Sequence, residues 1–172
     1  MPSFKPVHIL VNDKMQQNYA YTRTAPAGED FHPEFTPALT PKEMLTLGSF
    51  GGKYLNDCRG EFPEDWFENA RLSLGKKDIS LNYYQVDASQ PLAEWRRKGW
   101  IFPDDPRGWF QWYCRYYMGR RLPVEDLRQI KRWKGIRRHV GAIVKHCAPL
   151  DQNCRKKQRQ ALIHWAYDPR TL

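Results

Sequence analysis

DPRGWFQWYCRYYMGRR, residues 105–121, is the segment that decides the predicted fold. Six aromatic residues fall within nine positions, and arginines lie at both ends and in the middle. On a helical wheel the rings cover nearly every side, so most of this helix has to be buried. We expect Asp105 to cap the helix, with Pro106 at its first position and Gly119 at its end.

The rest of the chain also favours helices. TPKE, residues 40–43, is a capping box that begins a short helix, and Gly48 ends it. Strands are expected at residues 7–11 and 79–87. Further helices are expected from Pro63, over residues 89–99, from Pro123 to about Cys147, and from near Asn153 to Tyr167. The prediction is a mainly α fold, a single compact domain of about six helices with at most two short strands.

Charge divides the chain unevenly. Residues 1–93 hold 9 Lys/Arg and 12 Asp/Glu, whereas residues 94–172 hold 19 and 7. We therefore expect an irregular N-terminal segment, residues 1–39, packed on a helical domain, residues 40–172, whose C-terminal half is basic. Such asymmetry is typical of a protein that binds a polyanion, although a solvated basic face has the same composition.

The aromatic helix offers both rings and guanidinium groups. A buried arginine needs a partner, and its planar fork suits a carboxylate or a phosphate. Rings beside guanidinium groups bind unstacked bases and their phosphates. We expect phosphate contacts from Arg115, Arg120, Arg121, Arg128, Lys131, Arg132 and Arg138. We expect stacking from Tyr113, Tyr116 and Tyr117, with Gln111 on the same stripe as Arg115.

Several of these segments resemble a family of short proteins known only as hypothetical sequences. The resemblance is carried by FGGKY (residues 50–54), EFPEDWF (residues 61–67), the stretch GWIFPDDPRGWFQWYCRYYMGRR (residues 99–121) and RQIKRW (residues 128–133). It spans about residues 50–135. It implies no fold, activity or catalytic residue, and suggests only that these segments form one unit.

The segment FGGKYLNDCRGEFP, residues 50–63, is the best candidate for a reactive site. Gly51 and Gly52 permit positive φ angles and close approach of a ligand to the backbone. If the protein excised a base flipped out of DNA, Asp57 could orient water or stabilise the sugar cation, and Lys53 could bind phosphate or attack the sugar. The alternative interpretation is a plain turn that leads into a helix.

Neither a metal nor a cofactor is predicted. The segment at residues 50–63 lacks the spacing of a phosphate-binding loop, and no Cys-x-x-Cys pair exists. His146 and Cys147 point about 100° apart on a helix. A Cys147–Cys154 link, or simple packing of a thiol on the long helix, explains the late cysteines better than zinc does.

The sequence therefore predicts a nucleic-acid-binding protein, with DNA favoured over RNA. Its sharper form is a base-excision DNA glycosylase, a hydrolase, with Asp57 and Lys53 as catalytic residues. The alternative is a non-enzymatic RNA- or DNA-binding module, or an adaptor for an acidic protein partner. With no apolar run near ~18 residues and no secretory leader, we expect a cytoplasmic monomer that has no membrane partner.

Overall fold

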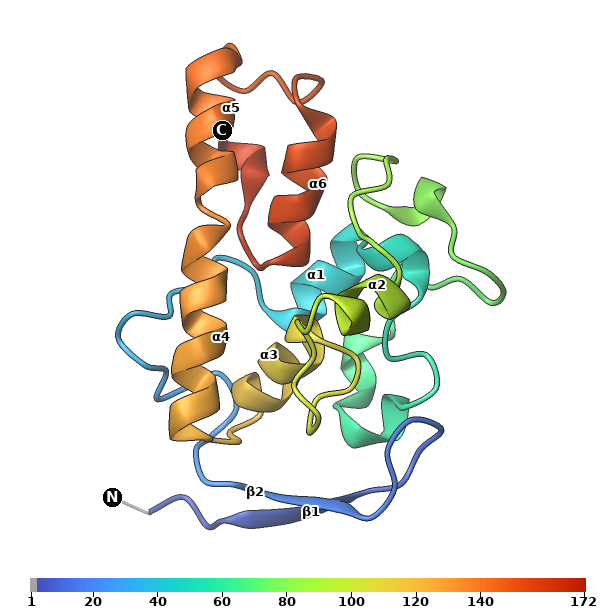
Figure 1. Ribbon diagram of the computed structural model, residues 1–172, viewed down its shortest axis with the longest axis vertical. Coiled ribbons are helices and arrows are strands. Elements are labelled where there is room, and N and C mark those ends of the chain that lie inside the picture. Colours follow the sequence, from blue (N-terminus) through green and yellow to red (C-terminus); the bar gives the residue numbers. More distant parts are fainter. Residues whose placement is uncertain (1–2) are drawn as a thin grey trace. The chain divides into compact units, whose positions relative to one another are not determined.

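The computed structural model describes residues 3–172 (Figure 1). That part of the chain is mainly helical and has two short antiparallel strands, which confirms the expected fold class. The strands are β1 (Val7–Val11) and β2 (Tyr19–Arg23). The α-helices are α1 (Pro41–Leu47), α2 (Leu92–Arg97), α3 (Trp109–Tyr117), α4 (Pro123–Gly135), α5 (Arg138–His146) and α6 (Lys156–His164). Single 3-10 turns lie at Phe50–Gly52, Arg59–Glu61, Glu64–Trp66, Ile79–Leu81 and Pro169–Thr171.

The chain forms two compact units, each built from two stretches of sequence. The first joins the chain up to Thr36 with Gln90–Ile130, and the second joins Pro37–Ser89 with Lys131–Leu172. The segments that carry the family resemblance are divided between the two units. The expected packing of residues 1–39 on a helical domain of residues 40–172 stays a prediction, because this division does not test it.

The first unit is built around α3 and a β-hairpin. The strand at Val7–Val11 is confirmed, and it pairs with β2 in a register that sets Val11 opposite Tyr19. The sequence prediction missed β2, because residues 19–23 lie in a region that otherwise reads as irregular and their pairing partner lies in the preceding strand. The segment after β2 continues along the end of α3, where Thr24 N–H donates to the Gly119 carbonyl at 2.8 Å.

Helix α1, in the second unit, begins as the sequence predicts. The Thr40 hydroxyl accepts a hydrogen bond from Glu43 N–H, and the Glu43 carboxylate accepts one from Thr40 N–H at 2.7 Å. The helix ends at Gly48, whose φ of +108° favours glycine. Any other residue would also place its Cβ 2.0 Å from the Leu81 carbonyl oxygen, so packing requires a glycine here as well.

Two predictions for the middle of the chain are wrong. The helix expected from Pro63 is a single 3-10 turn, Glu64–Trp66. The strand expected over residues 79–87 contains the 3-10 turn Ile79–Leu81, because the Asp78 carboxylate accepts from Ser80 N–H and starts a turn. Beyond it, Tyr84 N–H donates to the Gln160 side chain rather than to a neighbouring strand.

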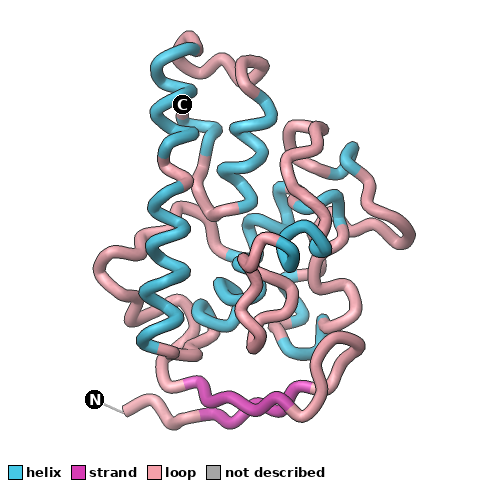
Figure 2. Tube along the Cα trace, in the orientation of Figure 1, coloured by secondary structure: helices cyan, strands magenta, loops and turns pink. Residues whose placement is uncertain are grey.

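The long helix expected between Pro123 and Cys147 is also wrong, because it is broken into α4 and α5. At the break, Ile136 N–H donates to Trp133 and Arg137 N–H donates to Lys134, so each bond reaches back three residues and tightens the chain. Helix α6 begins later than expected, since Arg155 adopts a left-handed φ of +53°. Figures 1 and 2 show α5 and α6 side by side in the second unit.

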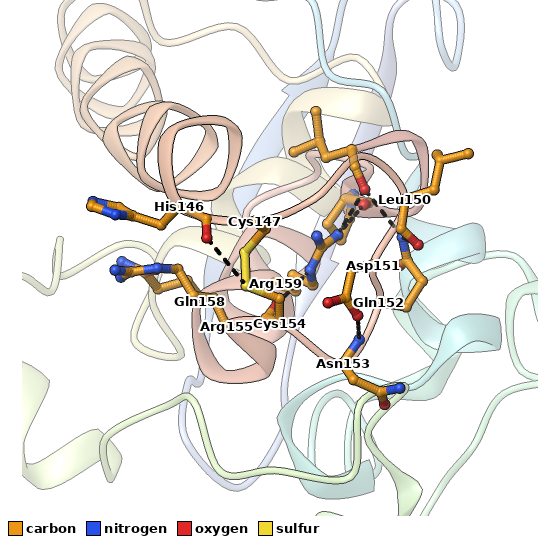
Figure 3. Close-up of a disulfide and its surroundings, with 12 residues drawn as sticks. His146, Cys147, Leu150, Asp151, Gln152, Asn153, Cys154, Arg155, Gln158 and Arg159 are labelled. Carbon is orange, nitrogen blue, oxygen red and sulfur yellow. Dashed lines mark hydrogen bonds between the residues drawn. A yellow bond between two sulfur atoms is a disulfide. The ribbon is translucent and has the colours of Figure 1, made fainter.

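A disulfide between Cys147 and Cys154 joins the end of α5 to the segment before α6 (Figure 3). It was one of the two alternatives that the sequence left open for these cysteines. The segment is held from α6 as well, because Arg159 Nε donates to the Cys154 carbonyl oxygen at 2.7 Å. The link fixes the two ends of the connection between α5 and α6.

His164 occupies the interior of the second unit as a neutral acceptor. Its ring stacks on Phe50 with 4.3 Å between centroids, and its Nε2 accepts from Phe50 N–H at 3.1 Å. The same nitrogen lies 3.0 Å from Gln160 Nε2, which therefore donates to it. Burial lowers the pKa of His164 from 6.5 to about 3.

We expect acidification to destabilise the protein through His164. The unfolded chain takes up this proton near pH 6.5, whereas the folded chain resists it down to about pH 3, so the free energy of unfolding falls as the pH drops through this window. One proton contributes at most about 1.4 kcal/mol per pH unit. Urea unfolding of the wild type and of His164→Gln, repeated across this pH range, measures how the free energy of unfolding depends on pH. The wild-type stability should fall more steeply, and parallel curves would contradict a neutral buried histidine.

Candidate nucleic-acid interface

The aromatic helix α3 is core rather than a stacking surface. Tyr113 and Tyr116 are each 1% exposed, and both make edge-on contacts with the buried ring of Phe35. The Tyr116 hydroxyl accepts from His32 N–H at 2.7 Å. Tyr117 is half-buried, and its ring packs against the backbone at Gly28. Bases therefore have no access to Tyr113 or Tyr116 in this fold.

Two of the predicted phosphate ligands bind a buried carboxylate instead. Arg115 and Arg120 are 0% and 1% exposed, and both guanidinium groups donate to Asp105, at 2.9 Å and 2.6 Å. Asp105 was expected to cap α3, but the N-cap is Gly108, which provides no side-chain bond. That expectation is wrong because the carboxylate is fully engaged by the two arginines. Gln111 is buried too and accepts from the N–H of residue 107.

The electrostatics of this cluster favour charged arginines. Burial lowers the pKa of Arg120, but the charge and hydrogen bonds of Asp105 more than offset it, so the pKa is raised overall. Arg115 also donates to the Asp104 carbonyl oxygen at 2.6 Å and to Gln16 Oε1 at 2.9 Å. The cluster therefore ties α3 to the preceding loop and to the β-hairpin connection.

Arg121 closes the C-terminal end of α3. Its guanidinium donates to the Tyr116 carbonyl oxygen at 2.6 Å and lies 3.9 Å from the centroid of the Tyr116 ring. It also donates to the Glu29 carbonyl oxygen at 2.9 Å. Burial lowers the pKa of Arg121. Its donors are thus directed at backbone carbonyl groups of its own unit.

The remaining predicted ligands lie on α4 and α5 and are more accessible. Arg128 is exposed but forms an ion pair with Glu125 at 2.7 Å, which neutralises part of its charge. Lys131 and Arg138 are exposed, and the described residues offer neither of them a salt bridge. Arg132 is half-buried, with its guanidinium 5.5 Å from the centroid of the Trp165 ring.

A further group of exposed cations overlaps the predicted set only at Arg138. Residues 131–172 contain eleven Lys/Arg and two Asp. Arg137 immediately precedes α5, and the solvent side of α5 opposite the buried Ile143 carries Arg138 and Lys145. Across the disulfide-closed connection, the exposed cations are Arg155, Lys156 and Lys157. We call these six residues the α5–α6 cationic face. The sequence predicts a basic C-terminal half, but the predicted phosphate ligands include only Arg138 of these six residues.

The proposed catalytic pair lies on an open loop. Lys53 and Asp57 are both exposed. A lysine that attacks a sugar has to be desolvated, and Lys53 is not. The adjacent glycines serve the fold, because a Cβ on Gly52 would lie 2.5 Å from the Ser73 nitrogen and Ser73 N–H donates to the Gly52 carbonyl. The group that lies close to the Gly52 backbone is therefore Ser73 of the same chain, rather than a ligand.

The described residues contain neither a candidate metal cluster nor a candidate membrane span. Within residues 3–172, His, Cys, Asp and Glu side chains form no group of three or more that could hold a metal ion. In the same range, no helix combines the length and the apolar character that crossing a membrane requires.

Comparison with known proteins assigns no family. No family model matches the chain, and neither a curated protein nor a solved structure matches it.

Asp105→Asn should destabilise the protein severely. The substitution removes the carboxylate charge that the buried Arg115 and Arg120 share, and removing one partner of a buried ion pair typically costs about 3–5 kcal/mol. Equilibrium urea unfolding measures the loss. Asp65→Asn is the matched control, because Asp65 pairs with Lys42 at the surface, where such a pair contributes at most about 1 kcal/mol. Equal effects from the two variants would contradict a central role for Asp105.

Proposed function

We propose that the protein binds nucleic acid, DNA in preference to RNA, through the α5–α6 cationic face. The observation that supports this most is the concentration of exposed Lys and Arg side chains on two helices that pack side by side and are joined by a disulfide. Because Arg115 and Arg120 are committed to Asp105, they have no part in this interface. Phosphate groups are the ligands that such a surface attracts without reading sequence.

The packing between the two helices supports a fixed arrangement of these charges. His139 Nδ1 lies 3.3 Å from Gln158 Nε2, which links α5 to α6 directly. The disulfide holds the connection at Cys147 and Cys154. Cations held on rigid elements can contact successive phosphates with less loss of conformational freedom than cations on a mobile tail.

The glycosylase activity stays a prediction of the sequence. The exposure of Lys53 and Asp57 gives it no added support. Incubation with duplexes that carry modified bases, followed by alkali, reveals abasic sites if the chemistry occurs. Loss of that cleavage in Asp57→Asn with unchanged DNA affinity would assign a catalytic role to Asp57.

We expect a triple variant of the α5–α6 cationic face, Arg138→Gln/Lys145→Gln/Lys157→Gln, to bind duplex DNA more weakly. Each lost phosphate contact reduces the slope of log affinity against log salt by about 0.9, so the triple variant should lose up to about 3. Fluorescence anisotropy of a labelled duplex across a salt series measures both quantities.

The matched control is Lys5→Gln/Lys14→Gln/Lys76→Gln, which removes the same net charge from exposed lysines outside this face. It should retain the wild-type slope. Equal losses in the two variants, or a flat wild-type plot, would overturn the proposal. Binding of polyglutamate as tight as that of DNA would favour an acidic protein partner instead.

A further inference from the structure

Trp100 is more exposed to solvent than tryptophan side chains usually are. Of the aromatic side chains in residues 3–172, two are exposed, Trp100 at 41% and Phe4 at 38%. Tryptophan is highly buried on average. The other tryptophans of the described chain are buried or half-buried. An exposed indole is therefore an exception in a protein that otherwise uses its rings for packing.

The backbone that carries Trp100 is well anchored. Gly99, with a φ of +69°, forms the turn after α2, and Trp100 N–H donates to the Trp95 carbonyl oxygen at 3.0 Å. Trp95 itself packs against Gly108, where a Cβ would lie 3.0 Å from its ring. One tryptophan thus fixes the turn to its unit, while the indole five residues later remains accessible.

Cations precede the accessible ring in the sequence, and one of them contacts it. Lys98 Nζ lies 4.6 Å from the centroid of the Trp100 ring. Arg96 and Arg97 occupy the last turn of α2 and are exposed. Glu94 pairs with Arg97 at 2.8 Å and also interacts with the charge of Lys98, whose Nζ donates to Gln90 Oε1 at 2.9 Å. The segment before the ring, residues 94–98, therefore carries three cations and one carboxylate, unlike Phe4, which has a single neighbouring lysine in sequence.

We propose that Trp100, Arg96 and Lys98 form a binding site for an unpaired base of single-stranded DNA. The base stacks on the indole, and the flanking phosphates contact the two cations, which is the combination that single-strand-binding surfaces use. The excess of positive charge in this segment favours an anionic ligand over a neutral sugar ring. This site rests on the proposed function for its class of partner, and it adds a preference for single strands that the α5–α6 cationic face does not provide.

The test measures Trp100→Ala against wild type with a labelled oligothymidylate and with a hairpin duplex of similar charge. Stacking on one aromatic side chain supports affinity by roughly tenfold or more. Affinity for the single strand should fall by that factor, whereas affinity for the duplex, whose bases are paired, should not change. Trp100→Phe, which keeps a ring, should restore most of the single-strand affinity.

Phe4→Ala is the matched control, since it removes an equally exposed ring that lacks the two cations, and it should bind like wild type. If Trp100→Ala binds the single strand as tightly as wild type, or loses both ligands equally, the stacking site is overturned. In that case the salt dependence of duplex binding would still test the α5–α6 cationic face independently. Quenching of tryptophan fluorescence by a neutral oligosaccharide but not by the oligonucleotide would also overturn the site.

Discussion

The first unit depends on one carboxylate that is shared by two arginines. Asp105 is 0% exposed and accepts from both Arg115 and Arg120. Desolvating three charged groups is costly, and only good geometry with further hydrogen bonds recovers that cost. The further bonds come from the hairpin, since Arg120 donates to the Tyr19 hydroxyl and Arg115 to Gln16. The aromatic helix and the hairpin are therefore positioned by the same buried charge cluster.

This cluster changes what the net charge of the sequence means. The formal charge of +9 counts every arginine equally, but Arg107, Arg115, Arg120 and Arg159 are buried. Their guanidinium groups are bound to Asp13, to Asp105 or to backbone carbonyl groups. Counting every arginine therefore overstates the positive charge that α3 presents to solvent, whereas the six residues of the α5–α6 cationic face are exposed.

Local rules predicted the local features, and long-range contacts decided the rest. The capping box at Thr40, the stop at Gly48 and the strand at Val7–Val11 depend on nearby residues, and the sequence contains all of that information. The ion pair of Arg120 with Asp105 and the hydrogen bond from Phe50 N–H to His164 join residues that are separated in the sequence. The periodicity of the sequence does not encode such contacts. Among the site residues, Lys131 and Arg138 are accessible as expected, whereas Tyr113, Tyr116, Arg115 and Arg120 are enclosed by such pairings.

The same reasoning explains why abundant aromatic residues are weak evidence for base stacking. A buried tyrosine or tryptophan needs a partner for its polar atom, and three buried rings of the first unit have such a partner. Trp112 Nε1 donates to Asp126, Trp109 Nε1 to the Gln129 carbonyl, and the Tyr116 hydroxyl accepts from His32 N–H. Rings whose polar atoms are hydrogen-bonded in this way serve the packing of the core. An indole that is exposed beside a cation, as Trp100 is beside Lys98, is the more informative case.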